Sequence, residues 1–324
     1  MSKHSPLSLI ERAALVYYFD VGLRGPARAP EARPAPAPAP VPVAERPRAV
    51  LVAVERKRPD PLAQIVEEAA RVAEPFAYAQ AGTAEVDCEK LAEAGFIVPG
   101  GPVTGLAEEF RLIKRQLLAG IERRVSLAED KRRSVLICSA QPDEGKSFCA
   151  INLALSLSGE RDVEVLLIDG DFSKPEVLST LGIPDGPGLV EALADANVDP
   201  EDFVIRTNLR GLSVLPAGRK ANNVPELLAS DRTREVLAKL VAGDKKRIIL
   251  FDSPPALMAS PATVLSAHVG QALVVVRADQ TTEADLRETI GLLSSCDHVG
   301  LILNGAGVVT GRKFGAYDGY GHDQ

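Results

Sequence analysis

The sequence predicts an α/β protein with a mostly parallel sheet that is covered by helices on both faces. Short runs of apolar and β-branched residues recur from residue 134 onward, and helical stretches lie between many of them. Near-continuous apolar strands of this kind are typical of parallel sheets with two buried faces. Such sheets bind ligands at the carboxyl ends of their strands, and polar residues gather there in this sequence.

The expected elements follow one another along the chain from residue 104. Helical stretches are predicted at residues 106–124, 147–158, 225–241 and 282–295. Strands are predicted at residues 134–139, 163–169, 212–218, 247–252, 272–277 and 299–304.

Composition divides the chain into five parts. These are an N-terminal amphipathic segment (1–25), a Pro/Ala-rich linker (26–47), an adaptor region (48–103), the main α/β domain (104–313) and a flexible tyrosine-containing tail (314–324). The linker is expected to be an extended spacer, because proline lacks an N–H group and fixes φ. The adaptor region contains an apolar run at 50–54 and a predicted helix at 62–74.

The bulk composition argues against several functional classes. A net charge of −7 provides no overall basic field, so no nucleic-acid partner is expected. No window of about 20 apolar residues predicts a transmembrane helix, and the N-terminus does not resemble a secretory signal. A cytoplasmic location is therefore expected. The four cysteines, at 88, 138, 149 and 296, are interpreted as reduced thiols, two of them in core elements, with metal ligation as the alternative.

A phosphate-binding loop is predicted between the first of these strands and the helix that follows it. Residues 140–147 read AQPDEGKS and match the pattern GxxxxGK[ST], except that Ala140 replaces the first glycine. Lys146 is expected at the β/γ-phosphates of a nucleotide and the Ser147 hydroxyl at Mg²⁺, while Gly145 permits close backbone approach. The pattern predicts a P-loop NTPase-type fold; a tight turn with a surface lysine is the alternative.

Acidic residues end two further strands of the predicted sheet. Asp169 and Asp171 are two residues apart, so both point the same way, and Asp252 ends another strand. A single aspartate at such a place is commonly a helix cap or a turn former. Three of them beside a P-loop favour a role in metal binding and proton transfer.

Several motifs in this order resemble those of the bacterial tyrosine kinases. SAQPDEGKS, LLIDGDFSKP and ILFDSPP are similar to the Walker A, A′ and B motifs of that family, within residues 104–313. SLIERAA, EEFRLIKRQLL, GKSFCAINLALSL and VLPAG resemble the exopolysaccharide-locus, exosortase-associated branch. The resemblance implies an ATP- and Mg²⁺-dependent protein tyrosine autokinase that regulates exopolysaccharide polymerisation and export.

The resemblance also implies roles for individual residues. Lys146, Asp169, Asp171 and Asp252 would be the catalytic residues, with Asp169 as base or orienter of the tyrosine hydroxyl. The implied metal ligands are Ser147, Asp171 and Asp252, and the implied nucleotide contacts are Asp143, Glu144, Gly145, Lys146, Ser147, Phe148 and, at the adenine, Asn304. Asp143 stands where the family has glycine; aspartate tolerates a left-handed conformation, but it adds an anion near the phosphates.

Two further sets of residues follow from the resemblance. Glu108, Arg111 and Lys114 match an E-x₂-R-x₂-R motif that would join subunits into a ring, although Lys114 replaces an arginine and lacks its bidentate fork. Without the family resemblance, these three residues are interpreted as a solvated helix face. Tyr317 and Tyr320 would be the phosphoacceptors, used between subunits, whereas by composition alone the tail is simply a Gly-rich end.

The family further implies partners and a location. These are a membrane chain-length determinant protein, a tyrosine phosphatase and a peripheral position at the inner membrane through the membrane partner, with residues 1–25 as the contact. Two other functions stay open. One is a dimerising ATPase switch, whose extra P-loop lysine is replaced here by Gln141. The other is a scaffold that uses ATP only for assembly.

Overall fold

The structure is a computed structural model, and it describes residues 83–306 except residue 245. These residues contain an eight-stranded sheet. Its strands are β1 (Thr83–Ala84), β2 (Ser134–Ser139), β3 (Glu164–Asp169), β4 (Ile205–Thr207), β5 (Leu212–Leu215), β6 (Arg247–Asp252), β7 (Gln271–Arg277) and β8 (Val299–Asn304).

The sheet is mixed but mostly parallel. The strand order is β1-β4-β5-β3-β6-β2-β7-β8, and only the β4–β5 pair is antiparallel. The central strands β2 and β6 are buried along their whole length. The predicted fold class, α/β with a mostly parallel sheet, is confirmed.

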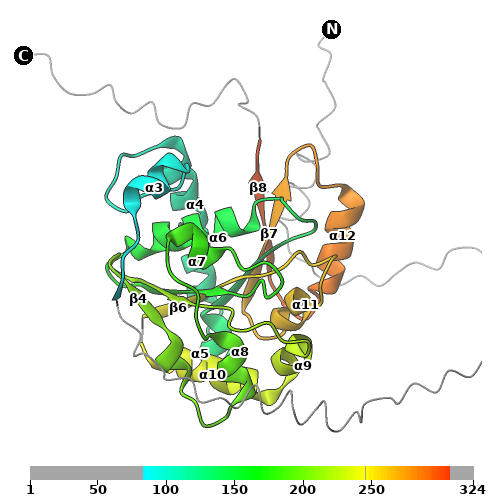
Figure 1. Cartoon of the computed structure of the whole chain (residues 1–324). Helices are drawn as coiled ribbons and strands as arrows, with labels where there is room; N and C mark the ends of the chain where they lie inside the picture. The colour runs from blue at the N-terminus through cyan, green and yellow to red at the C-terminus, as the bar shows by residue number, and fades with distance from the viewer. Residues whose placement is uncertain (1–82, 245, 307–324) are drawn as a thin grey trace, which may run out of the picture. The chain divides into compact units, whose positions relative to one another are not determined.

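Helices cover both faces of this sheet (Figure 1). They are α3 (Cys88–Glu93), α4 (Gly105–Arg123), α5 (Glu129–Arg132), α6 (Lys146–Ser158), α7 (Val177–Leu181), α8 (Leu189–Ala194), the 3₁₀ helix η1 (Pro200–Phe203), α9 (Val224–Ala229), α10 (Asp231–Ala242), α11 (Pro261–Ser266) and α12 (Glu283–Leu292).

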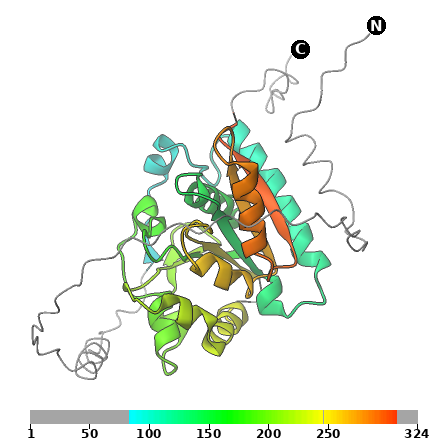
Figure 2. The same cartoon turned by 90° about the vertical axis from the view of Figure 1, so that its right-hand side faces the viewer.

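Alternation along the strands creates two apolar cores, one on each face. On β2, Val135 and Ile137 pack with side chains of α4, α6 and α7, whereas Leu136 and Cys138 pack with those of α8 to α11. At the β7–β8 side of the sheet, α12 lies along these two strands (Figure 2). A sheet buried on both faces in this way exposes functional groups mainly at the ends of its strands.

Most predicted elements agree with the structure to within one residue, but three differ. The helix expected over 282–295 begins at Glu283 and ends at Leu292, three residues early. The strand expected over 212–218 ends at Leu215, because the next carbonyls, of Pro216 and Ala217, accept hydrogen bonds from the first amides of α8. The helix expected over 225–241 is two helices. Ser230 between them has extended backbone angles (φ −76°, ψ 158°) and donates through its N–H and its hydroxyl to the Leu227 carbonyl.

Other predictions lie wholly or partly outside the described residues. They concern the N-terminal segment, the linker, the apolar run at 50–54, the helix at 62–74 and the tail tyrosines Tyr317 and Tyr320. Among the described residues, Cys138 and Cys149 are buried in β2 and α6. No helix in the described part of the chain has the length and apolarity needed to cross a membrane.

The C-terminal part of the adaptor region, residues 83–103, packs directly on α6. Asn152 of α6 is fully buried; its Oδ1 accepts a hydrogen bond from the Ile97 N–H (2.8 Å), and its Nδ2 donates to the Phe148 carbonyl (2.9 Å). The rings of Phe96 and Phe148 lie 5.0 Å apart. Asn152 therefore holds this segment against the first turns of α6.

We predict that Asn152→Ala lowers the free energy of unfolding by about 1–3 kcal/mol, because it leaves the partly buried Ile97 N–H without an acceptor. Urea unfolding of the full chain measures the change. Asn222→Ala, at an exposed asparagine, is the matched control and should change stability by less than about 0.5 kcal/mol. Equal effects of the two substitutions would contradict the anchoring role of Asn152.

Candidate functional site

The predicted phosphate-binding loop joins β2 to α6 through two residues with left-handed backbone angles. Asp143 has a positive φ of 60° and Gly145 a φ of 92°. A Cβ atom at residue 145 would also collide with the side-chain amide of Asn304. The loop leads into the N-terminus of a 13-residue helix, where backbone N–H groups and the helix dipole favour an anion.

Lys146 begins this helix and extends toward the acidic strand ends. Its Nζ lies 3.0 Å from Oδ2 of Asp171 and 3.4 Å from the Ser147 hydroxyl oxygen. Burial pulls the pKa of Lys146 down, but the carboxylates of Asp252 and Asp171 outweigh it and hold the pKa above its ordinary value. The lysine is therefore a fixed positive charge at the mouth of the loop.

Asp252 is fully buried at the end of β6, and neither of its carboxylate oxygens makes a hydrogen bond of ordinary geometry among the described residues; the Ser147 hydroxyl is only close enough to oppose the rise of its pKa. Burial raises its pKa to about 7, although the charge of Lys146 opposes this shift. Bare carboxylate oxygens close to a lysine and a serine hydroxyl fit a hard cation such as Mg²⁺.

The described residues contain no group of three or more His, Cys, Asp or Glu side chains arranged to hold a metal. Magnesium commonly takes one or two carboxylates and completes its shell with substrate phosphates and water. Asp252 and Ser147 suit that mode of binding.

Asp169 lies beside Asp252, because the two residues are in register on the neighbouring strands β3 and β6. Its Oδ1 accepts from the Asp171 N–H (3.3 Å) and its Oδ2 from the Val177 N–H (3.0 Å). Burial and the charge of Asp252 raise its pKa to about 7. A carboxylate with that pKa is suited to accept a proton near neutral pH.

Asp171 connects the lysine to the turn that follows β3. Its Oδ1 accepts from the Ser173 hydroxyl and from the Lys174 N–H, each at 3.1 Å, while Oδ2 pairs with Lys146. Both carboxylate oxygens are thus fixed. The structure therefore brings together Lys146, Ser147 and the three predicted aspartates.

The other predicted nucleotide contacts have protein partners of their own. Phe148 packs on Phe96, and Nδ2 of Asn304 donates to the Glu144 carbonyl (2.9 Å). The Glu144 side chain accepts from the Gln141 N–H and from the Thr281 hydroxyl. Sequence reasoning missed Thr281, which lies 137 positions from Glu144 and has no recognisable motif around it.

The three residues of the predicted interface motif do not share one environment. Glu108 and Arg111 form an ion pair with each other on the partly exposed side of α4. Lys114 is only 8% exposed, and its Nζ donates to the Ser156 carbonyl (2.9 Å) and pairs with Glu160 (2.7 Å). Within this chain, Lys114 therefore joins α4 to the end of α6.

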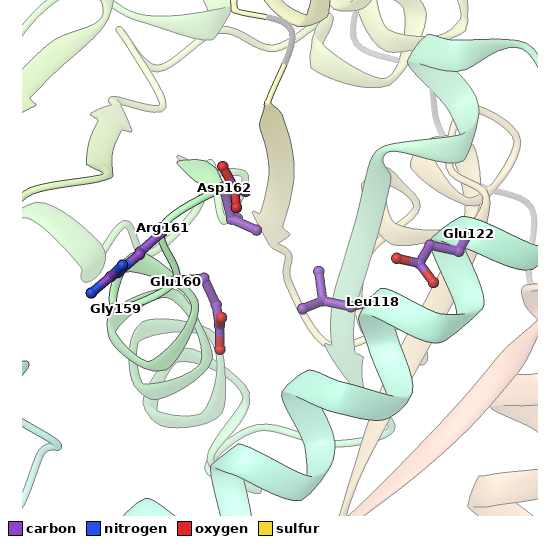
Figure 3. Close-up of a pocket in the computed structure, with 7 residues that line it drawn as sticks. Leu118, Glu122, Gly159, Glu160, Arg161 and Asp162 are labelled. Atoms are coloured by element: carbon purple, nitrogen blue, oxygen red, sulfur yellow. The ribbon is translucent and has the colours of Figure 1, made fainter.

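A hollow of about 590 Å³ lies beside this junction, between α4 and the turn after α6 (Figure 3). Its lining residues are Leu118, Glu122, Gly159, Glu160, Arg161, Asp162 and Val163. Helix α6 has 13 residues and spans roughly 20 Å, with Lys146 at its opposite end. The hollow is therefore separate from the phosphate loop.

Known proteins are similar to this chain in sequence and in structure. The tyrosine-protein kinase YwqD of Bacillus subtilis is 29% identical over 214 residues, which cover 65% of this chain and 86% of that protein. The putative tyrosine-protein kinase CapB of Staphylococcus aureus is 26% identical over 68% of this chain and 93% of its own length. Several longer tyrosine kinases match over only 24–28% of their length.

The fold has a counterpart among solved structures. The BceF tyrosine kinase domain superposes with a TM-score of 0.54 and 26% identity, over 74% of this chain and 88% of that one. No protein-family model matches the chain. The relatives in sequence are named as tyrosine-protein kinases and the neighbour in structure is a tyrosine kinase domain, so both comparisons show that this chain is similar to bacterial tyrosine kinases.

Proposed function

We propose that this chain is an ATP-dependent protein tyrosine autokinase that phosphorylates its own C-terminal tail between subunits and thereby regulates exopolysaccharide polymerisation and export. The observation that carries the proposal is the buried carboxylate of Asp252, without a hydrogen bond of ordinary geometry in the described part of the chain, beside Lys146 and Ser147. An unpaired buried carboxylate is costly, so its persistence at a phosphate loop points to a ligand.

Each residue of the site has a defined role in this proposal. Lys146 holds the β/γ-phosphates and neutralises charge that develops between them, and the N-terminus of α6 supports it. Ser147 and Asp252 hold Mg²⁺, with help from Asp171. When bound, Mg²⁺ would neutralise phosphate charge and orient the γ-phosphoryl group.

Asp169 positions the acceptor tyrosine and takes up its proton. The tyrosine oxygen forms a bond to the γ-phosphorus, the bond from that phosphorus to the β–γ bridging oxygen breaks, and ADP leaves. The phenolic proton passes to the Asp169 carboxylate, whose pKa of about 7 suits this transfer. Positioning contributes most of the rate if the transition state is loose.

The proposal also includes the assembly of the subunits and the proteins that act on this assembly. The subunits form a ring through α4, and Tyr317 and Tyr320 receive the phosphates. Each phosphate adds about −1.5 to −2 charge, which loosens the ring, and a tyrosine phosphatase reverses the change. Residues 1–25 bind a membrane chain-length determinant protein, which brings the otherwise cytoplasmic chain to the inner membrane.

The first prediction is tail phosphorylation. Full-length protein incubated with Mg²⁺-ATP should gain phosphate at Tyr317 or Tyr320, because the loop and its acids position the γ-phosphoryl group for transfer. Lys146→Met should abolish the modification, and Tyr317→Phe/Tyr320→Phe should remove its acceptor. Intact-mass and peptide mass spectrometry detect it, with and without the cytoplasmic segment of the membrane partner.

Phosphate on the tail of the wild type but not of Lys146→Met supports the autokinase. If ATP binds and no tyrosine is modified under any condition, the autokinase proposal fails, and the assembly scaffold or the ATPase switch takes its place.

The second prediction concerns Asp252 and pH. A folded-state pKa of about 7, above the ordinary value of 3.8, means that ionisation is penalised in the folded protein. This carboxyl group therefore lowers the free energy of unfolding progressively as pH rises from about 4 through 7. Asp252→Asn, which cannot ionise, should be more stable than nucleotide-free wild type by roughly 1–3 kcal/mol at pH 8, and by less at pH 5.

Urea unfolding at the two pH values measures this difference. The exposed Asp185 provides the control, since Asp185→Asn should change stability by less than about 0.5 kcal/mol at either pH. Asp252→Asn should also lose tail phosphorylation. A variant that is less stable than wild type at pH 8 would show that Asp252 is a structural group.

The third prediction separates the members of the interface motif. Arg111→Ala should disperse the oligomer, because its guanidinium is on the accessible face of α4, while changing the stability of the subunit by less than about 1 kcal/mol. Lys114→Ala should instead destabilise the subunit by about 1–2 kcal/mol, because the Ser156 carbonyl loses its donor. Sedimentation velocity and urea unfolding distinguish the two; an unchanged oligomer in Arg111→Ala contradicts the ring interface.

A further inference from the structure

The Glu144 carboxylate belongs to the phosphate loop but has partners on the protein side. Glu144 is only 2% exposed. Oε2 accepts from the Gln141 N–H at 2.9 Å, and Oε1 accepts from the Thr281 hydroxyl. The first bond closes the loop on itself, and the second attaches it to the segment after β7.

The direction of the second bond follows from the partners of Thr281. The Arg277 N–H, at the end of β7, donates to the Thr281 hydroxyl oxygen (2.8 Å), and the Thr281 N–H donates to the Arg277 carbonyl (3.0 Å). A hydroxyl has one proton, and here that proton is available for Glu144 alone. Thr281 is thus held by the backbone on one side and directed at the loop on the other.

A second connection reaches the same loop residue from β8. Nδ2 of Asn304 donates to the Glu144 carbonyl (2.9 Å), and the Asn304 carbonyl accepts from the Ala278 N–H (2.8 Å). Between the two connections, Asp279 has a positive φ of 60°, an uncommon conformation for a residue other than glycine. The β7–α12 segment therefore has a specific shape that places Thr281 beside the loop.

We propose that Thr281 is a positioning residue for ATP binding: through Glu144 it fixes the phosphate loop in the conformation that receives the β- and γ-phosphates. This inference deepens the proposed function and rests on it. Without the hydroxyl, Glu144 loses one of its two donors and the Arg277 N–H loses its acceptor. The loop then samples other conformations, and the binding-competent fraction of the protein falls.

The test compares Thr281→Val with Thr281→Ser. Valine has the shape of threonine without the hydroxyl, so we expect the Kd and the KM for Mg²⁺-ATP to rise about tenfold, which corresponds to about 1.4 kcal/mol. The turnover rate at saturating ATP should change little, because bound ATP restores the loop. Serine retains the hydroxyl and should restore the affinity of the wild type.

A neighbouring threonine provides the matched control. Thr282 is exposed and caps α12 by accepting from the Asp285 N–H, without a bond to Glu144 among the contacts described. Thr282→Val should lower the melting temperature yet leave the affinity for ATP unchanged. Binding of a fluorescent ATP analogue to the full chain and thermal unfolding of the same samples give both quantities.

Glu144→Gln adds an independent variant, because an amide oxygen can replace only one of the two carboxylate acceptors. If Thr281 acts through Glu144, the double variant Thr281→Val/Glu144→Gln should bind ATP no more weakly than the weaker single variant.

The outcomes separate this inference from the proposed function. If the wild type binds no more ATP than Lys146→Met does, the proposed function fails. A wild type that binds ATP with the same affinity as Thr281→Val overturns the positioning role alone. Equal loss of affinity in Thr282→Val also overturns it, because the effect then reflects general damage to the segment.

Discussion

The structure depends most on two carboxylates buried side by side at the ends of β3 and β6. Asp169 and Asp252 are in register and fully buried, and each has its pKa raised to about 7. A buried charge requires a partner, and here Lys146 lies close enough to oppose the shift at Asp252. The rest of the site, from the P-loop to the turn after β3, surrounds this pair.

The geometry of that pair requires close backbone packing. The Gly170 N–H donates to the Asp252 carbonyl at 2.7 Å, and a Cβ at residue 170 would lie 2.7 Å from the same oxygen. Only glycine therefore allows β3 and β6 to end together. The same principle applies across the site, where Gly145 makes room for the Asn304 amide. The burial of the Asp252 carboxylate lowers the stability of the fold, but it creates an electrostatic arrangement that suits a phosphate and a cation.

Several features could be predicted from the sequence because they depend on local chemistry. The apolar runs of β2, β6 and β8 predicted their bounds correctly, and the GKS triplet predicted the start of α6 to within one residue. The helix expected over 225–241 was wrong, because helical periodicity continues across Ser230 while its hydroxyl competes for the Leu227 carbonyl. The partners of the Lys114 side chain could not be predicted from the sequence either, since they lie in α6 and in the turn after it.

The sequence by itself determined the class of fold, the phosphate loop and the identity of its acidic partners, because strand periodicity and loop chemistry act over short distances. Only the tertiary structure decided that Asp252 would lack a hydrogen bond of ordinary geometry, that Glu144 would bond to Thr281, and that Asn304 would contact the loop backbone. The two contacts of Glu144, with Thr281 and with Asn304, join residues that are 137 and 160 positions apart in the sequence. Their geometry is set by how the strands are ordered in the sheet, which local periodicity does not encode.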